Sequence, residues 1–145
     1  MFSTFDISAS GLTAQRLRID IISGNIANIN TTRTEEGGPY RRKLPVFEEK
    51  QEGSFYSILN SKVKQSSSSR GVQLRGIVED QSPLKLVYRP EHPDANEDGY
   101  LSLPNVEVTT EMVDMIEASR AYEANITALN TTKNMAMQAI RIGQA

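Results

Sequence analysis

The placement of proline divides this chain of 145 residues into three parts. All six prolines lie between Pro39 and Pro104, and both ends of the chain lack them. A proline inside a helix costs about 3 kcal/mol, so only the two ends can hold long unbroken helices. We therefore expect helices within residues 1–30 and 106–145, and loops and strands in residues 31–105. The predicted fold class is α+β, with the terminal helices pairing as a coiled-coil-like core beside a small β-rich middle domain.

The N-terminal part has the spacing of one helical face, with apolar residues separated alternately by three and four positions. We expect a helix near residues 4–29, about 37 Å long at 1.5 Å per residue. Its predicted packing face consists of Phe5, Ser8, Leu12, Gln15, Ile19, Ile22, Ile26 and Ile29.

The C-terminal part carries two such stripes, and we expect a helix over residues 109–142 that stops at Gly143. Acidic residues near its start and basic residues near its end complement the helix dipole. The first stripe contains Val108, Met112, Met115, Ser119, Tyr122, Ile126, Leu129, Lys133, Ala136 and Ile140. The second contains Ala118, Ala121, Asn125, Ala128, Thr132, Met135, Ala139 and Ile142.

Two stripes on one helix are more than a single partner helix can cover. The repeat favours packing against neighbouring molecules, and the alternative is that the β-rich middle folds over the second stripe. We expect packing within the subunit to join Leu12, Ile19, Ile22, Ile26 and Ile29 to Met115, Tyr122, Ile126 and Leu129. We expect contacts between subunits at Ala118, Ala121, Asn125, Ala128, Met135, Ala139 and Ile142.

The middle part reads as a connector followed by short strands. Gly37 and Gly38 indicate a turn in the connector. Strands are predicted at residues 41–47, 54–59, 72–78 and 84–88. Irregular structure is predicted at residues 89–105, because Pro90, Pro93, Gly99 and Pro104 fall there.

Composition excludes most site chemistry. The chain has no cysteine and one histidine, which removes thiolate nucleophiles and the common zinc sites. The net charge of −2 and the scattered glycines indicate neither nucleic-acid nor nucleotide binding. No enzymatic activity, cofactor, metal or small-molecule substrate is expected. No apolar run is long enough for membrane insertion, and the N-terminus lacks the pattern of a cleaved signal peptide.

Three polar motifs remain, each with a plain interpretation beside a functional one. Residues 94–99 match the first half of a calcium-binding loop, but Asn105 stands where the bidentate carboxylate is needed, so an acidic turn is favoured over a calcium-regulated module. His92 is interpreted as a loop residue. The basic residues 41–43 precede several glutamates, which favours a solvated surface over phosphate binding.

Four asparagines lie on the predicted helices. Their amides either hydrogen-bond between helices and fix the helix register, or they face solvent. The sequence leaves these alternatives equally open for Asn25, Asn28, Asn125 and Asn130.

The two ends carry a resemblance to a known family. Residues 23–28 (SGNIAN) with 37–42 (GGPYRR), and residues 111–125 (EMVDMIEASRAYEAN), resemble the terminal signatures of bacterial flagellar rod and hook proteins. The middle residues 92–96 (HPDAN), followed by Gly99-Tyr100 and Pro104-Asn105-Val106, are similar to the proximal-rod members of the flagellar basal-body rod family.

The resemblance implies a structural subunit of the basal-body rod, a periplasm-spanning assembly that transmits torque. Its terminal helices would form a helical tube with further copies and other rod proteins. Export would proceed through the flagellar export apparatus without a cleaved signal peptide. The alternative is a generic coiled-coil adaptor that binds a partner helix in a complex of fixed stoichiometry.

Overall fold

The computed structural model describes residues 2–35, 37–50 and 71–143. One long helix stands at each end of the sequence, and two antiparallel strand pairs lie between them. This order of elements confirms the predicted α+β class. The elements in chain order are α1 (Phe2–Ala27), β1 (Lys43–Glu49), β2 (Val72–Glu79), β3 (Lys85–Tyr88), β4 (Tyr100–Leu103) and α3 (Val108–Ile142).

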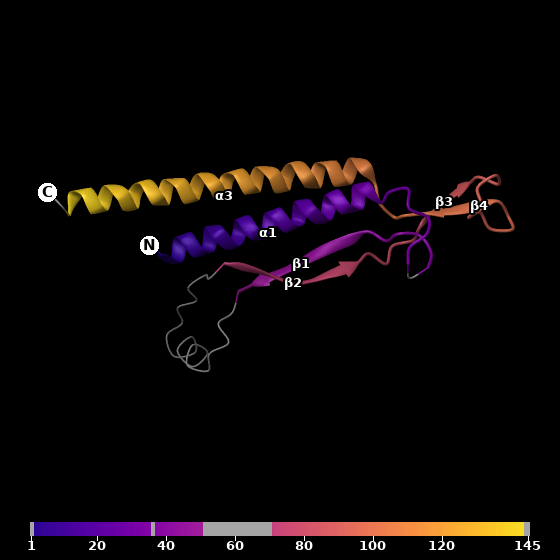
Figure 1. Ribbon diagram of the computed structural model, residues 1–145, viewed down its shortest axis with the longest axis horizontal. Coiled ribbons are helices and arrows are strands. Elements are labelled where there is room, and N and C mark those ends of the chain that lie inside the picture. The colour runs from indigo at the N-terminus through magenta and orange to yellow at the C-terminus, as the bar shows by residue number, and fades with distance from the viewer. Residues whose placement is uncertain (1, 36, 51–70, 144–145) are drawn as a thin grey trace, which may run out of the picture.

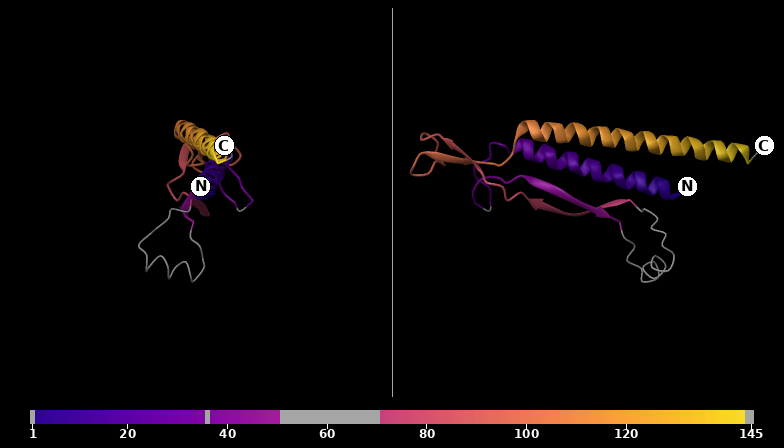
Figure 2. Two further views of the ribbon diagram at one scale, coloured as in Figure 1. Left: turned by 90° about the vertical axis from the view of Figure 1, so that its left-hand side faces the viewer. Right: turned by 180° about the vertical axis from the view of Figure 1, so that it is seen from behind.

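The molecule is elongated, with its elements arranged in layers along one axis. Helices α1 and α3 lie side by side and antiparallel, so the start of α1 and the finish of α3 lie at the same end of the molecule (Figure 1). The β1–β2 hairpin packs on α1, and the β3–β4 hairpin projects beyond the other end of the helices (Figure 2). Among the described elements, α3 packs only on α1. The alternative in which the β-rich middle covers α3 is therefore wrong for the described residues.

The first hairpin is held against α1 by a close backbone approach. Gly71 precedes β2 with a φ of +95°, and a Cβ added to it would lie 2.2 Å from the Ser10 hydroxyl of α1. That hydroxyl accepts a hydrogen bond of 3.0 Å from the backbone N–H of Val72. Glycine is the residue that tolerates both the positive φ and the close contact.

The helix boundaries agree with the predictions within two residues. Helix α3 ends before Gly143, whose N–H donates to the carbonyl of Ala139 at 3.1 Å. The strand predicted at residues 41–47 lies at Lys43–Glu49, and the strand predicted at 54–59 lies outside the described residues. Irregular structure was the wrong prediction for residues 100–103, which form β4. The loop of residues 89–99, which ends at Gly99 with a φ of +80°, reverses the chain and brings Tyr100 opposite Tyr88.

The described core is small for a chain of this length. Its buried apolar side chains are Ile22, Leu101, Pro104, Val106 and Ala118, and many large apolar side chains are exposed. None of the described helices combines the length and apolar character that crossing a membrane requires. A helix pair with so little buried apolar surface gains stability mainly by further packing.

Candidate functional site

The α1–α3 contact follows the middle of one broad apolar face of α3. The two predicted stripes are neighbours around the helix, and α1 packs along the boundary between them. The inner edge of each stripe is buried or half-buried: Met115, Tyr122, Leu129 and Ala136 in the first, and Ala118, Ala121, Asn125 and Thr132 in the second.

This arrangement differs from the predicted roles of the stripes. Ala118 has 0% exposed surface, so it packs within the subunit and the predicted contact with a neighbour is wrong for it. Asn125 lies against α1, since a Cβ on Gly11 would be 3.0 Å from its side-chain oxygen. Ile126, predicted to pack internally, is 38% exposed. A stripe with a seven-residue repeat drifts by about 20° per repeat around a straight helix, so it cannot stay on one side of a straight partner.

The side chains on the predicted packing face of α1 differ in how deeply they are buried. Ile22 is buried, while Leu12, Ile19 and Ile26 are half-buried. Ile29, also half-buried, lies in the turn after the helix. Side chains on α1 therefore share their burial between α3 and the β1–β2 hairpin.

Helix α3 has two exposed edges, which begin on either side of its contact with α1 and continue past the start of α1; we call them the outer edges. Their apolar residues recur along the helix, with Ser119 and Lys133 between them in the first stripe, and extended exposed apolar surface marks interaction sites. The outer edge of the first stripe contains Val108, Met112, Ile126 and Ile140, and that of the second contains Ala128, Met135, Ala139 and Ile142.

Helix α3 continues beyond the start of α1. It has 35 residues against 26 in α1. The antiparallel register set by the facing pairs Gly11–Asn125 and Asn25–Glu111 brings the start of α1 level with Asn134. Past this point no described helix or strand lies beside α3, and Ile142 is 79% exposed.

The other end of α3 is closed by a buried polar junction centred on Asn25. Its amide nitrogen donates to the backbone carbonyl of Lys43 at 2.9 Å and to the Glu111 carboxylate at 3.0 Å. Its oxygen accepts from the backbone N–H of Lys43 and from the hydroxyl of Tyr40, both at 2.9 Å. Every hydrogen-bonding position of a side chain that is 1% exposed is therefore filled.

Arg42 completes the junction from the strand side. Its guanidinium contacts the buried carboxylate of Glu111 through Nε and that of Asp114 through Nη2 at 2.9 Å. Arg18 of α1 reaches the second oxygen of Asp114 at 3.3 Å. The backbone N–H of Arg42 also donates to the side-chain oxygen of Asn105 at 2.9 Å. Helices α1 and α3 and the start of β1 are thus joined by charged and polar contacts at one place.

The junction also perturbs an ionisable group. Partial burial of Tyr40, followed by the negative charges of Glu111 and Glu79, raises the pKa of its phenol above the ordinary value. The neutral hydroxyl is the form that can donate to Asn25. The environment of the junction therefore favours the protonation state that its hydrogen bonds require.

The junction resolves several of the alternatives left open by the sequence. Asn25 bonds between helices, as one alternative predicted, whereas the amide of Asn28 bonds the carbonyl of Gly24 at 2.9 Å and that of Asn125 bonds Ala121 at 2.9 Å within their own helical segments. Asn130 is exposed. The solvated-surface prediction for residues 41–43 is wrong at Arg42, whose side chain is only 19% exposed.

The junction was only partly predictable from the sequence. Glu111 and Asp114 were expected to act through the helix dipole, yet their carboxylates pair with side chains from distant segments. The motif around Arg42 supplied the only sequence clue, because the resemblance already singled out residues 37–42. Spacing alone does not show which residue of a three-residue basic cluster is buried.

The acidic loop between β3 and β4 has a structural role. Asp94 accepts hydrogen bonds from Thr32 at 2.8 Å and from Arg33 at 2.7 Å, which ties the loop to the connector after α1. Nδ1 of His92 accepts from the backbone N–H of Asp94 at 3.2 Å. Within the described residues no three His, Asp or Glu side chains gather as a metal-binding group. These contacts fit the acidic turn that the sequence favoured.

Two protein families match the two ends of the chain. Residues 5–33 match the family described as "Flagella basal body rod protein". Residues 97–142 match the family described as "Flagellar basal body rod FlgEFG protein C-terminal". The two matches cover most of α1 and all of α3, and the strand side of the junction, with Tyr40 and Arg42, lies between them.

Curated relatives match over nearly the whole chain. A flagellar basal-body rod protein FlgC of Bacillus subtilis is 49% identical, covering 99% of this chain and 98% of the relative. The FlgC protein of Borreliella burgdorferi is 46% identical with the same coverage. That of Aquifex aeolicus is 41% identical over 93% of this chain and 91% of the relative. The similarity thus extends through the middle part as well as the ends.

Proposed function

The chain belongs to the flagellar basal-body rod protein family, and on that premise we propose that it is a structural subunit of the proximal rod. The subunits pack through the outer edges of α3 into a helical tube that spans the periplasm and transmits torque. The observation that carries this proposal is the unpartnered apolar surface of the outer edges, which lies beside the α1–α3 contact at Met112, Ile126 and Ala128 and continues beyond the start of α1. The role requires no catalytic group and no cofactor.

The outer edges support packing with neighbours along the length of the helix. Burial of apolar surface contributes about 25 cal/mol per Å², so the stabilisation grows with the length of the contact. The two edges lie on different sides of α1 and differ in composition: the first contains Met112 and Ile126, and the second contains the small residues Ala128 and Ala139. Two different edges suit a heterologous contact, in which one edge of each subunit meets the other edge of the next. Such contacts generate open helical assemblies when they do not close into a ring.

The polar junction supports the transmission of torque. A load on the middle part reaches α3 through the Arg42 contacts with Glu111 and Asp114, and reaches α1 through Asn25. Buried charge-assisted contacts tolerate little misalignment, because an unpaired buried charge is costly. The junction would therefore hold the strands and helices in one orientation under load.

Export and partners follow from the same proposal. The subunit would leave the cell through the flagellar export apparatus without a cleaved signal peptide, and would then meet further copies and other rod proteins. The exposed apolar edges fit a chain that completes its packing after export, when neighbours become available.

The test places a charge on an outer edge. We expect Ala128→Glu to abolish rod assembly and swimming, because it places a carboxylate in a contact between subunits. Thr127→Glu is the matched control, since Thr127 is exposed on the side of α3 turned away from α1 and outside both edges. Electron microscopy of basal bodies and swimming assays measure both variants in cells lacking the native protein.

The outcomes separate the proposal from its alternative. Normal rods with Ala128→Glu would contradict packing through the outer edges. A generic adaptor would form a complex of fixed stoichiometry with one partner, which size-exclusion chromatography with light scattering detects. The proposal instead predicts an assembly whose size grows with concentration.

A further inference from the structure

The two strands of the β1–β2 hairpin differ at the edges that face away from each other. In an antiparallel pair, alternate residues turn their backbone N–H and C=O away from the partner strand. The bond from the N–H of Asp80 to the carbonyl of Arg42, and that from Lys50 to Gly71, show which residues face inward on either side of the bulge. The outward-facing residues that follow from this register include Lys43 and Pro45 on β1, and Leu74 and Ile77 on β2.

The edge of β1 is blocked where the strand leaves the junction. Asn25 bonds both the N–H and the carbonyl of Lys43, each at 2.9 Å. Pro45, the next outward-facing residue, has no N–H to donate. A further strand therefore cannot pair along this part of β1.

The edge of β2 is open. Its first outward-facing N–H, that of Val72, is bonded to the hydroxyl of Ser10. Within the described part of the chain, the outward N–H groups of Leu74 and Ile77 have no hydrogen-bond partner. The two residues are 40% and 49% exposed. Unpaired donors beside exposed apolar side chains are what an added strand requires, and we call this stretch the open edge of β2.

An apolar groove lies between α1 and the start of β2. Ala14 and Leu17 line it from α1, and Phe47, Val72 and Leu74 line it from the hairpin. Successive side chains of a strand point to opposite faces, so every second side chain of an added strand would point toward α1 and this groove. The groove therefore favours a segment with apolar residues at alternate positions.

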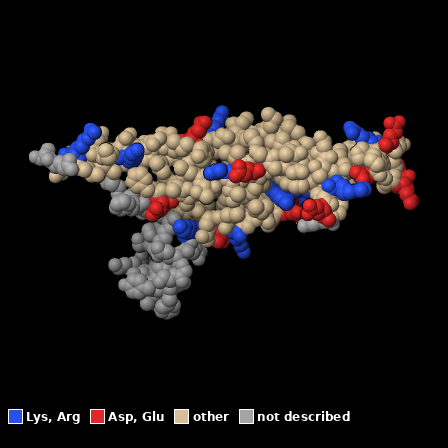
Figure 3. Space-filling view, in the orientation of Figure 1, with Lys and Arg blue, Asp and Glu red and all other residues tan. Residues whose placement is uncertain are grey.

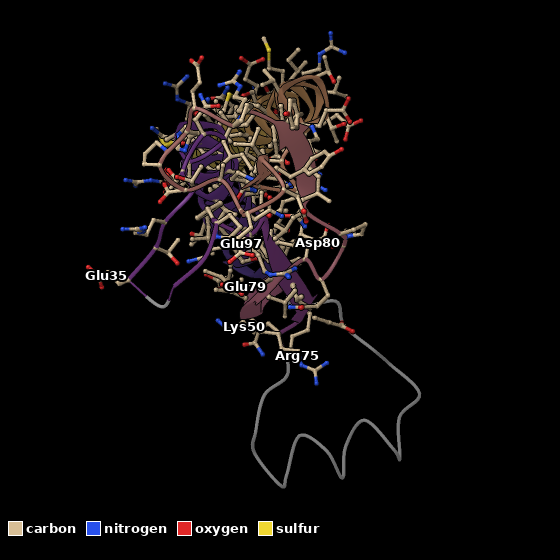
Figure 4. All side chains as sticks on the ribbon, turned by 90° about the vertical axis from the view of Figure 1, so that its right-hand side faces the viewer. Glu35, Lys50, Arg75, Glu79, Asp80 and Glu97 are labelled. Carbon is tan, nitrogen blue, oxygen red and sulfur yellow. The ribbon has the colours of Figure 1, made fainter. Side chains whose placement is uncertain are left out.

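The open edge of β2 also carries positive charge. Arg75, the extra residue at the bulge, and Lys50, which lines the groove, are both exposed. Figure 4 shows both side chains on the side of the hairpin away from α3, and basic side chains lie along the lower margin of the molecule in Figure 3. Glu79, which is also exposed, stands at the far end of β2. Antiparallel pairing of two β2 edges about their middle would bring two copies of Arg75 together, which disfavours a second copy as the occupant.

We propose that the open edge of β2 binds an extended segment of another protein as a third strand, with apolar residues at alternate positions and an acidic residue beside Arg75. The backbone of the segment pairs with Leu74 and Ile77, its apolar side chains enter the groove, and its carboxylate meets the cations of Arg75 and Lys50. This contact goes beyond the proposed function and uses no residue of the outer edges of α3.

Amide exchange in the purified full-length chain, followed by NMR, tests whether the edge is open. We expect the N–H groups of Leu74 and Ile77 to exchange faster than that of Val78, which faces β1 in the register. Slow exchange of Leu74 and Ile77 in the free chain would mean that the edge is already paired, and would overturn the proposal.

A peptide of alternating valine and threonine, blocked at both ends and with two aspartates at its centre, is the probe for binding. We expect it to slow exchange at Leu74 and Ile77 by about tenfold or more. We also expect it to bind at least about tenfold more tightly than the same peptide with two lysines, because the lysines meet Arg75 and Lys50. Isothermal titration calorimetry measures both affinities. Absence of binding, or equal affinities, would overturn the proposal.

Two proline variants distinguish the edges of the hairpin. Ile77→Pro removes an open N–H without removing a bond between the strands, because that N–H points away from β1. Glu49→Pro is the matched control, since its N–H points away from β2 by the same register. We expect Ile77→Pro to abolish binding of the aspartate peptide and Glu49→Pro to retain it, with circular dichroism checking that both variants fold. Equal binding by the two folded variants would contradict pairing at β2.

Arg75→Glu tests the charge without changing the backbone. We expect it to reverse the preference, so that the lysine peptide binds about tenfold more tightly than the aspartate peptide. An unchanged preference would exclude recognition of an acidic residue at Arg75.

Light scattering on the chain alone tests the remaining occupant. A dimer in which Leu74 and Ile77 are protected from exchange would identify a second copy on this edge and overturn the proposal, whereas a chain that leaves both residues unprotected supports it. These measurements use no assembled rod, so their failure is distinct from failure of the outer edges, which depends on Ala128→Glu in cells.

Discussion

The two ends of α3 show opposite ways of using a helix. At its start, Glu111 and Ala118 are completely buried, and the carboxylate is matched by Asn25 and Arg42. At its finish, from Met135 to Ile142, the large apolar side chains are exposed and no described element lies beside the helix. One end is complete within a single chain, and the other presents surface without a partner.

The difference lies in the kind of interaction as well as in burial. Charged and polar groups at the start have one arrangement that satisfies them, since a buried unpaired group is penalised. Apolar surface at the finish tolerates several arrangements at similar free energy. A subunit that must have one shape but join different neighbours benefits from placing the first kind inside and the second outside.

The largest expected effect comes from removing the cation at the closed end. Arg42→Ala leaves the fully buried Glu111 carboxylate without its guanidinium, and we expect the free energy of unfolding to fall by about 3–5 kcal/mol. Urea denaturation of the free chain, followed by circular dichroism, measures this loss.

Two arginines serve as controls for that loss. Arg41→Ala removes only hydrogen bonds of 3.3 and 3.5 Å to the carbonyls of Asp80 and Ser82. Arg141→Ala acts at the open end, where the side chain is exposed. Both are expected to change stability by less than about 1 kcal/mol. Equal losses for Arg42 and Arg141 would remove the contrast between the two ends.

A smaller effect is expected from adding volume at two alanines of the same helix. Ala118→Leu overfills a site with no exposed surface, and we expect a loss of about 1–3 kcal/mol in the free energy of unfolding. Ala128→Leu adds the same atoms to an exposed outer edge and is expected to be nearly neutral in the free chain. Thermal unfolding of the two variants side by side measures the difference, and a neutral Ala118→Leu would mean that α1 does not cover this site.

The smallest expected effect is the pH dependence of the closed end. The pKa of Tyr40 is raised by partial burial and by nearby carboxylates, relative to about 10 in the unfolded chain. Its contribution to stability is therefore fully present below pH 10 and is lost as the pH rises through the folded-state pKa. We expect the native chain to lose more stability than Tyr40→Phe between pH 9 and about 11.5, measured by urea denaturation at each pH. The same slope for both chains would exclude Tyr40 as the source.

The helices were predictable because their signals are local. The absence of proline and the spacing of three and four fix α1 and α3 within a few residues, and neither depends on the rest of the fold. Strand β2 was predictable for a similar reason, since Val72, Ile77 and Val78 place several strand-favouring residues in one short run. The family resemblance, carried by motifs at both ends, gave the class of protein.

The contacts between distant segments were not predictable in the same way. Ala118 and Ala128 belong to one stripe, and only the position of α1 buries the first and exposes the second. Likewise, Arg41 and Arg42 are adjacent in a basic cluster, but only Arg42 contacts Glu111. Such outcomes depend on how straight helices and a hairpin dock, and periodicity within one segment contains no information about that docking.

The pairing of Asn25 with Lys43 has a consequence for the strand that follows. The amide of Asn25 both donates to and accepts from the backbone of Lys43, as a neighbouring strand would. A slip of β1 by one residue would break both bonds and turn Leu44 and its successors to the opposite face. The first hairpin therefore takes its alignment from a side chain of the N-terminal helix, so the helix acts as a template for the sheet.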